Sequence, residues 1–216
     1  MIIAIDGPAG SGKSDVGRRV AEALGLAFVD SGLMYRAVGR RALDVGVSLT
    51  DPEALTRLAG ATAVRIEGTS VRVDGRDYTE RVYDPEVSEA ASHVAQVPGV
   101  RLAVVGQLRT MGSAGVVMAG RDIGTDVFPD ADLKFYLTAS SEERARRRAA
   151  QLAGRGQNAD PARLRVEVEE RDRRDAGRAV APMRPAGDAV VLETDGLDLP
   201  EVVAEVLRRV KGMCGL

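Results

Sequence analysis

Cysteine and histidine are almost missing from this sequence of 216 residues, which contains one of each. The single cysteine, Cys214, excludes a disulfide within the chain and any metal site built from several thiolates. The single histidine, His93, excludes a metal site with two histidine ligands, and serine–histidine catalysis would depend on that one residue. The chemistry of the protein must therefore come mainly from other side chains.

Long hydrophobic runs and a strong charge of one sign are also absent. No apolar stretch approaches the roughly 20 residues that a membrane span needs, and no basic segment with a following apolar run indicates a signal peptide. The 30 basic and 32 acidic side chains give a formal net charge of −2, so neither nucleic acid nor an anionic membrane is an expected partner. We expect a soluble, cytoplasmic protein.

Lysine is scarce, since it occurs only at positions 13, 134 and 211, and all other basic residues are arginines. Genomic composition is one explanation of this bias. The other is functional, because planar guanidinium groups hold phosphates and bases through paired hydrogen bonds. Under either explanation, Lys13 stands out as the lone lysine near the N-terminus.

Short apolar segments alternate with helical patterns along the chain. Strands are expected at 2–5, 27–29, 116–118, 133–137 and 190–192, and helices at 13–24, 33–45, from 51, 84–96, 100–111, from 140, 161–175 and 199–211. This alternation predicts one α/β domain over residues 1–216, with a five-stranded parallel sheet and helices on both faces.

Residues 62–78 break this pattern. Val64, Ile66, Val71 and Val73 alternate with polar residues, and Gly68 lies between the two pairs. Such alternation predicts a small antiparallel hairpin. We therefore expect a core formed by residues 1–60 and 97–216, interrupted by an insert at 61–96.

A glycine-rich segment lies directly between the first predicted strand and the first predicted helix. It fits the pattern Gly-x4-Gly-Lys-Ser and consists of Gly7, Pro8, Ala9, Gly10, Ser11, Gly12, Lys13 and Ser14. Its backbone N–H groups and the following helix N-terminus can surround a phosphate, with Lys13 on the β- and γ-phosphates and Ser14 on Mg²⁺. A turn without a ligand is the alternative, but the context favours binding of a nucleoside triphosphate.

Two classes of nucleotide-binding protein fit poorly. The only asparagine, Asn158, is not followed by lysine, unlike the guanine-reading segment of GTP switches, and strand 116–118 runs into Ala119 rather than the aspartate of a motor ATPase. Arg36, Arg121 and Arg178 instead lie on loops at the expected carboxyl edge of the sheet, where ligands bind. Several cations there favour transfer of a phosphoryl group to a second phosphate.

Several motifs together resemble the bacterial cytidylate kinases, which are P-loop nucleoside monophosphate kinases. They are Ile5-Asp6 before the glycine-rich segment, Asp30-Ser31-Gly32 with Tyr35-Arg36, residues 120–125 with Val127-Phe128-Pro129, Glu170-Arg171-Asp172 with Asp175, and residues 178–182. The resemblance runs from residue 2 to the last helix.

The resemblance implies transfer of the γ-phosphoryl group of Mg²⁺-bound ATP to CMP or dCMP. It places Arg36 and Arg121 on the acceptor phosphate, Ser31, Arg171 and Asp175 by the ribose, Ser92, Arg101 and Asp122 on cytosine, and Arg178 near the transferring group. Arg147 and Arg148 would face the donor phosphates, residues 61–96 would form the monophosphate-binding insert, and a lid would lie at about 150–165. We expect a monomer.

Two positions depart from the family pattern. Asp15, in the ATP-binding segment, stands where relatives commonly have threonine or serine, and it places a negative charge close to phosphate. Ala119 stands where some relatives have aspartate. That strand end therefore offers no carboxylate for Mg²⁺, which would be held by ATP, Ser14 and water.

Less specific interpretations of the same residues remain. Capping of the turn that follows is the alternative for Asp122, and Arg171 with Asp175 fits an exposed ion pair. At least half of the arginines at 144–148 are expected on a solvated face. The chain could also be a nucleotide sensor without turnover, or a kinase of UMP, AMP or a small hydroxyl compound that uses Asp30 or Asp122 near the γ-phosphate.

Overall fold

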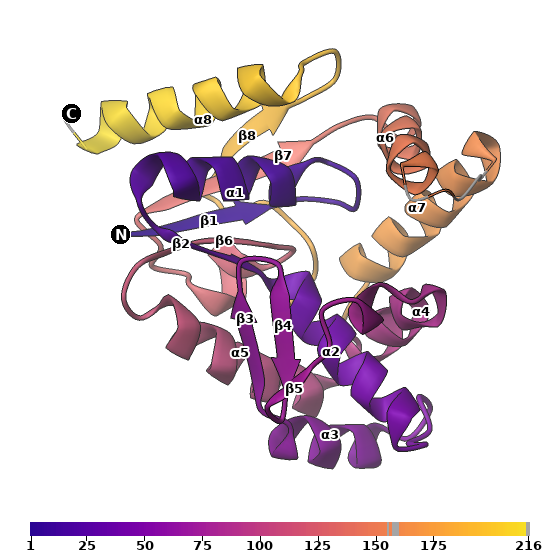
Figure 1. Cartoon of the computed structure of the whole chain (residues 1–216). Coiled ribbons are helices and arrows are strands. Elements are labelled where there is room, and N and C mark those ends of the chain that lie inside the picture. The colour runs from indigo at the N-terminus through magenta and orange to yellow at the C-terminus, as the bar shows by residue number, and fades with distance from the viewer. Residues whose placement is uncertain (155, 157–159, 215–216) are drawn as a thin grey trace.

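A five-stranded parallel sheet forms the centre of the computed structural model, which describes residues 1–154, 156 and 160–214. Its strands lie in the order β2-β6-β1-β7-β8 (Figure 1). They are β1 (Ile2–Asp6), β2 (Ala27–Asp30), β6 (Val116–Gly120), β7 (Leu133–Thr138) and β8 (Val190–Glu193). The predicted sheet is confirmed, and the strand pairs are all parallel.

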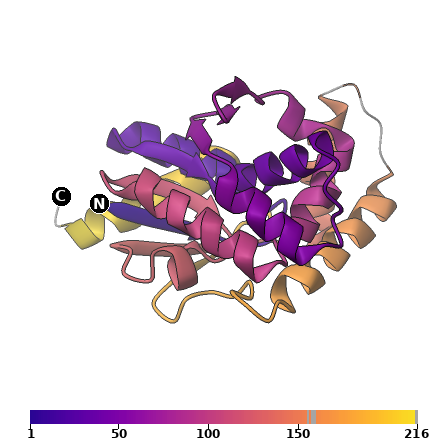
Figure 2. The same cartoon turned by 90° about the horizontal axis from the view of Figure 1, so that it is seen from below.

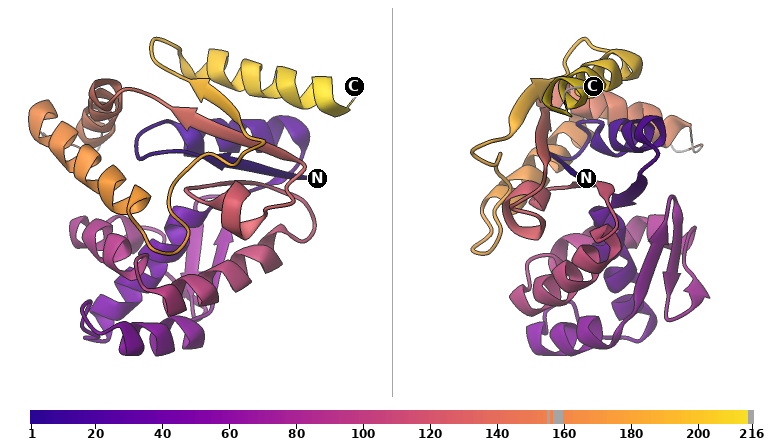
Figure 3. Two further views of the ribbon diagram at one scale, coloured as in Figure 1. Left: turned by 180° about the vertical axis from the view of Figure 1, so that it is seen from behind. Right: turned by 90° about the vertical axis from the view of Figure 1, so that its left-hand side faces the viewer.

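Helices cover both faces of this sheet (Figure 3). Helices α1 (Lys13–Leu24) and α8 (Leu199–Cys214) pack on one face, and α2 (Ser31–Asp44) and α5 (Pro98–Gly112) pack on the other. Side chains of a strand alternate between faces, so Ile3 and Ile5 pack with Val20, whereas Ala4 packs with Met34. Burial of both faces explains why these strands are uniformly apolar in sequence.

The segment predicted to be an insert contains a second, antiparallel sheet. It has three strands, β3 (Val64–Glu67), β4 (Ser70–Val73) and β5 (Arg76–Asp77). The hairpin is confirmed, but β5 was not predicted because two residues carry no readable alternation. Val71 and Val73 pack in the same hydrophobic cluster as α2 and α5. The exact insert boundaries, 61 and 96, stay a prediction.

Three further elements complete this part of the chain. They are α3 (Pro52–Ala61), the 3₁₀ turn η1 (Arg81–Tyr83) and α4 (Pro85–Val94). Helix α3 packs beside α5 (Figure 2), and α4 packs against α2. Residue Asp51 caps α3 as its sequence predicts, with a side-chain oxygen 2.9 Å from the Ala54 N–H.

The carboxyl edge of the parallel sheet carries the π-helical turn η2 (Ile123–Val127) and helices α6 (Ser141–Ala153) and α7 (Pro161–Ala176). Helices α6 and α7 lie side by side beyond the ends of β1 and β7 (Figure 1). The predicted lid at 150–165 includes residues 155 and 157–159, which lie outside the described residues. No helix in the described part of the chain is long and apolar enough to cross a membrane.

Two helices begin earlier than the sequence pattern predicted. Helix α2 begins at Ser31 rather than 33, because the Asp30 carboxylate accepts a hydrogen bond of 2.9 Å from the Gly32 N–H and so caps the helix. Helix α5 begins at Pro98 rather than 100, since proline is well suited to the first turn.

Candidate active site

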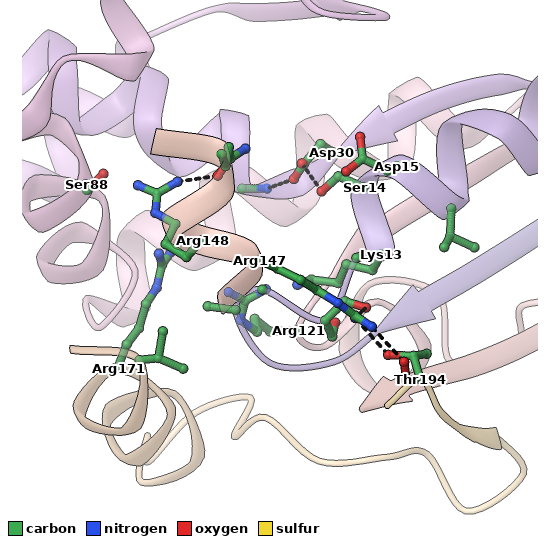
Figure 4. Close-up of a pocket in the computed structure, with 18 of the residues that line it drawn as sticks. Lys13, Ser14, Asp15, Asp30, Ser88, Arg121, Arg147, Arg148, Arg171 and Thr194 are labelled. Atoms are coloured by element: carbon green, nitrogen blue, oxygen red, sulfur yellow. Dashed lines mark hydrogen bonds between the residues drawn. The ribbon is translucent and has the colours of Figure 1, made fainter. Parts of the chain in front are cut away.

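A cleft of about 1390 Å³ opens at the carboxyl edge of the sheet. It is lined by the glycine-rich segment, by α2 and α4 on the side of the insert, and by α6 and α7 on the opposite side (Figure 4). The cleft lies where parallel α/β sheets bind their ligands. Among the predicted site residues, it is lined by Ala9, Gly10, Ser11, Gly12, Lys13, Ser14, Asp15, Arg36, Ser92, Arg121, Arg147, Arg148 and Arg171.

The glycine-rich segment has the backbone of a phosphate-binding loop. Gly7, Gly10 and Gly12 have φ values of 146°, 79° and 85°, a region that side chains other than glycine rarely adopt. A Cβ atom on Gly7 would lie 2.1 Å from the Leu137 carbonyl oxygen. The loop therefore requires glycine at these positions, as the sequence motif implied.

Lys13 is the first residue of α1, at the end of this loop, and only 7% of the residue is exposed. Its ammonium group donates a hydrogen bond of 2.8 Å to the Pro8 carbonyl. Burial and the nearby Arg121 guanidinium lower the pKa of Lys13 well below its usual value. A triphosphate in the loop would supply the negative charge that this cluster of cations lacks.

Ser14 forms a hydrogen bond with a carboxylate, although Ala119 at the end of β6 replaces the aspartate of some relatives. Its hydroxyl donates a hydrogen bond of 2.6 Å to Asp30. Hydroxyl and carboxylate oxygens suit Mg²⁺, so Ser14 and Asp30 fit a cation held chiefly by ATP phosphates. No group of three His, Cys, Asp or Glu side chains in the described part of the chain could hold a metal by itself.

Asp15 is exposed to solvent, close to Ser14 in the cleft (Figure 4). Its side chain is 58% exposed and lies 3.1 Å from Arg18 in an ion pair. It still lines the cleft beside Lys13 and Ser14 (Figure 4). The structure therefore places a partly screened negative charge at the edge of the donor site.

The turn after β6 is held by Asp6, which the sequence analysis named only as part of the motif before the glycine-rich segment. The buried Asp6 carboxylate accepts hydrogen bonds of 2.8 Å from both the Ile123 and Gly124 N–H groups. Burial is the main cause that raises the pKa of Asp6 to about 6. Arg121 and Asp122 immediately precede these amides, so Asp6 fixes the backbone that aims both side chains.

Asp175 joins two of the predicted phosphate-binding arginines. It accepts a hydrogen bond of 3.0 Å from Arg121 and forms an ion pair with Arg178. Burial opposes ionisation, but Arg121 and Arg178 outweigh it and lower the pKa of Asp175. The interpretation of Arg171 and Asp175 as an exposed ion pair is wrong, because only 6% of Asp175 is exposed and the ion pairs of Asp175 are with Arg121 and Arg178.

Arg171 lies on α7 opposite the phosphate loop. It is half-buried, and burial together with the Arg121 charge lowers the pKa of its guanidinium to about 10. Figure 4 shows Arg148 of α6 on the same side of the cleft, with Arg121 and Lys13 nearer its floor. The side chains therefore surround the cleft with positive charge.

Arg101 and Asp122 form a buried ion pair between α5 and the turn after β6. The Asp122 side chain makes no capping hydrogen bond to the following turn, so the cap interpretation is wrong. The Arg101 guanidinium also lies 5.6 Å from the centre of the Tyr35 ring. Its Nε is buried and has no hydrogen-bond partner among the described residues.

Ser31 and Ser92 are also buried, at 4% and 8% exposure. Ser31 is the first residue of α2, and a Cβ on Gly120 would lie 2.5 Å from its hydroxyl oxygen. The structure therefore brings α2, α4, α5 and the end of β6 together around one region. Arg178 lines an adjoining hollow of about 580 Å³ that is also lined by Gln96, which follows α4.

Arg36 extends from α2 to the insert. Its guanidinium donates hydrogen bonds of 2.9 Å to the Val82 carbonyl and 3.0 Å to the Ser88 hydroxyl. Ser88 also lines the cleft (Figure 4). Sequence reasoning did not single out Ser88, because a serine on a helix carries no signal of the arginine that reaches it from 52 positions away.

The arginines of α6 have different environments. Arg147 donates hydrogen bonds to the hydroxyl and carbonyl of Thr194, at 2.9 and 2.6 Å, and passes over the phosphate loop (Figure 4). Arg146 is exposed and paired with Glu143, whereas Arg144 is buried. Of the four arginines at 144–148, only Arg146 is exposed, while Arg147 and Arg148 are half-buried and Arg144 is buried, so the run is less solvated than predicted.

The phosphate loop between β1 and α1, on a five-stranded parallel sheet, gives the chain the P-loop nucleotide-binding fold of the α/β class. A crystal structure of an uncharacterized protein from Eubacterium ventriosum shares this fold, with a TM-score of 0.54 at 10% identity and 98% of both chains covered.

The family model described as cytidylate kinase matches residues 3–212. The cytidylate kinase of Pelotomaculum thermopropionicum is 48% identical over 214 residues, which cover 96% of this chain and 95% of that relative. A bifunctional pantoate ligase/cytidylate kinase of Synechococcus sp. (strain JA-2-3B'a(2-13)) is 47% identical over 95% of this chain, which spans only 40% of that relative's length. The chain belongs to the cytidylate kinase family.

Proposed function

We propose that the protein transfers the γ-phosphoryl group of ATP to CMP or dCMP and releases ADP with CDP or dCDP. The observation that carries this proposal is one cleft that is lined both by the phosphate loop and by arginines from α2, the turn after β6, α6 and α7. One triphosphate and one monophosphate together bring about five or six negative charges, and such a cleft neutralises them.

The donor would lie on the loop 7–14. Lys13 would contact the β- and γ-phosphates, and the loop amides would surround the β-phosphate. Arg147 and Arg148 of α6 also line the cleft and would contact the donor phosphates. Asp15 would lie close to the donor without a favourable contact to it.

Mg²⁺ would be held by the ATP phosphates together with the Ser14 hydroxyl. Asp30 accepts the Ser14 hydrogen, which leaves the lone pairs of the Ser14 oxygen free to face the cation. When bound, the cation neutralises charge on the β- and γ-phosphates. Asp30 thereby supplies the nearby carboxylate that Ala119 does not.

The acceptor phosphate would be bound by Arg36 and Arg121, with Arg178 reaching the transferring group. Asp175 holds Arg121 and Arg178 in place, and Ser31, Arg171 and Asp175 would contact the ribose. Positioning and neutralisation of the phosphate oxygens supply most of the catalysis in such transfers. No general base is needed, because the acceptor is already a phosphate anion.

Cytosine would be bound where Ser92, Arg101 and Asp122 meet. Asp122 can only accept hydrogen bonds and suits the N4 amine, whereas Arg101 can only donate and suits N3 and O2. The unpartnered Nε of Arg101 supports a ligand acceptor in this region. A hydroxyl acceptor is less well supported, because the two candidate carboxylates, Asp30 and Asp122, already have the partners Ser14 and Arg101.

Release of ADP in a coupled assay with a panel of acceptors tests the proposal. CMP and dCMP should give turnover, while UMP, AMP and small hydroxyl compounds should give little. Binding of ATP without turnover of any acceptor would instead support a nucleotide sensor. Light scattering after gel filtration would test the proposed monomer.

A further inference from the structure

The phosphate loop is contacted by Arg144, a member of the arginine run at 144–148 of which at least half was expected on a solvated face. The Arg144 side chain of α6 is only 8% exposed. Its Nη1 donates a hydrogen bond of 3.1 Å to the Ala9 carbonyl, and its Nε donates one of 3.0 Å to the Ala139 carbonyl. The guanidinium thus bonds a peptide within the loop, and Arg144 is not among the residues that line the cleft.

That peptide is the one between Ala9 and Gly10. A trans peptide is planar, so its carbonyl and its N–H point in opposite directions. Holding the Ala9 carbonyl outward therefore keeps the Gly10 N–H directed inward, towards the phosphate position. The Gly10 N–H has no hydrogen-bond partner among the described residues. A charged donor on the carbonyl also polarises the peptide and strengthens its N–H as a donor.

The backbone of the loop lies against Arg144 closely enough to need glycine. Gly10 has a φ of 79°, and a Cβ atom there would lie 3.1 Å from both the Cβ and the carbonyl oxygen of Arg144. The first turn of α6 and the loop are therefore in direct contact over backbone as well as side chain.

Arg144 is in turn held by α7, the helix that carries the proposed ribose contacts. Asp172 forms an ion pair with the same Nη1 that bonds Ala9. Asp172 lies between Arg171 and Asp175 in sequence, and the other Asp172 oxygen, Oδ1, is buried without a partner among the described residues. Helix α7 therefore contacts the donor loop through Asp172 and faces the acceptor with its neighbours.

We infer that Arg144 is a positioning residue for the donor phosphate, which orients the Gly10 N–H through the Ala9 carbonyl, and that Asp172 orients Arg144 from the acceptor-side helix. This inference deepens the proposed function and rests on it for the identity of the donor. It adds two residues that touch neither substrate to the machinery of transfer.

Three variants test the inference. Arg144→Gln keeps one N–H donor group but loses the positive charge and the paired N–H groups of the guanidinium. Arg144→Lys keeps the charge but lacks the paired N–H groups. Asp172→Asn removes the negative charge that pairs with Arg144. Arg208→Gln on α8 is the control, because Arg208 is exposed and its ion pair is with Glu205. Equilibrium binding of a non-hydrolysable ATP analogue and of CMP is measured separately, together with both KM values and thermal unfolding.

We expect Arg144→Gln to raise the Kd of the ATP analogue at least about tenfold, with the Kd of CMP changed less than about twofold. Asp172→Asn should also raise the Kd of the ATP analogue, by a smaller factor. The double variant Arg144→Gln/Asp172→Asn should bind the analogue no worse than Arg144→Gln alone, because the two residues act in one chain of contacts. Amide hydrogen exchange at residues 9–12 should quicken. If Arg144→Gln does not fold, Arg144→Lys and Asp172→Asn carry the same test.

Equal weakening of both ligands, or analogue binding unchanged in a folded Arg144 variant, would overturn the inference. Wild-type turnover of CMP is measured first. Its absence would contradict the proposed function, whereas analogue binding by the wild type and its variants would still decide the role of Arg144.

Discussion

Arg101 and Asp122 form an ion pair that is buried in the protein interior, where either charge without the other would be destabilising. Their side chains are 3% and 5% exposed, and removal of one member of such a pair leaves an uncompensated buried charge. The Arg101 guanidinium only donates hydrogen bonds, and the Asp122 carboxylate only accepts them. Under the proposed function, the pair would present the two polarities that cytosine needs and uracil reverses, so base selection is the most specific prediction for this site.

Lys13→Ala should abolish most turnover and leave the fold intact. Loss of one preorganised phosphate donor typically costs ~10²–10³ in rate. Burial and Arg121 already disfavour the Lys13 charge, so its removal should not lower the melting temperature. Circular dichroism with a coupled ADP assay measures both, and turnover near that of the wild type would rule out the role of the phosphate loop.

Arg178→Lys should be damaging although it keeps the charge. A lysine cannot reproduce a paired contact with two phosphate oxygens, nor hold Asp175 in the same geometry. We expect kcat to fall about tenfold or more, with a smaller change in the KM for CMP, because the contact should tighten in the transition state. A change confined to the KM for CMP would make Arg178 a ground-state binder instead.

Asp6 should give the protein a pH-dependent stability. Its pKa of about 6 in the folded protein lies above the unfolded value, so the folded state binds the proton more tightly. The stabilising contribution of protonated Asp6 is then complete below pH ~4 and lost as the pH rises through 6.

The measurement is chemical unfolding of wild type and Asp6→Asn from pH 4 to pH 7.5. The wild type's free energy of unfolding, relative to that of the variant, should decrease by about 2–3 kcal/mol over this range. A constant difference between the two proteins would show that Asp6 has the same pKa in both states.

Asp15→Thr should tighten binding of ATP. The Asp15 carboxylate lies at the edge of the donor site, and Arg18 screens it only partly because both are exposed. Removing an exposed charge of this kind should lower the KM for ATP about two- to fivefold, and high salt should reduce the gain. Glu22→Gln, an exposed residue at the far end of α1, should leave the KM unchanged. A higher KM for ATP in Asp15→Thr would indicate a favourable contact instead.

Local patterns in the sequence predicted most of the fold. The apolar strands with their intervening helices determined the parallel sheet, and the glycines of residues 7–12 could be read because each position has a backbone conformation or a close approach that only glycine satisfies. Strand β5 was not predicted, because it is only two residues long. Helix starts at Ser31 and Pro98 were displaced by capping chemistry that the apolar pattern does not report.

Contacts between distant segments could not be predicted in the same way. The partners of Asp6 lie 117 and 118 positions away, and Arg144 reaches Ala9 across 135. In sequence, Arg144 belongs to a run of arginines that all fit a solvated helix face. Only the packing of α6 on the phosphate loop distinguishes the buried Arg144 from Arg146, which is exposed.

The ratio of kcat/KM for CMP to that for UMP tests base selection most directly, in wild type and in Asp122→Asn. Each ratio is internal to one protein, so loss of stability or of active fraction on breaking the buried pair does not affect it. The wild type should prefer CMP by up to ~10⁴-fold, since UMP leaves buried groups unpaired. Asp122→Asn should narrow that ratio, because an amide can turn its N–H groups towards O4 of uracil. A wild type that uses UMP as well as CMP, or a ratio unchanged by the substitution, would contradict the reading of cytosine by Arg101 and Asp122.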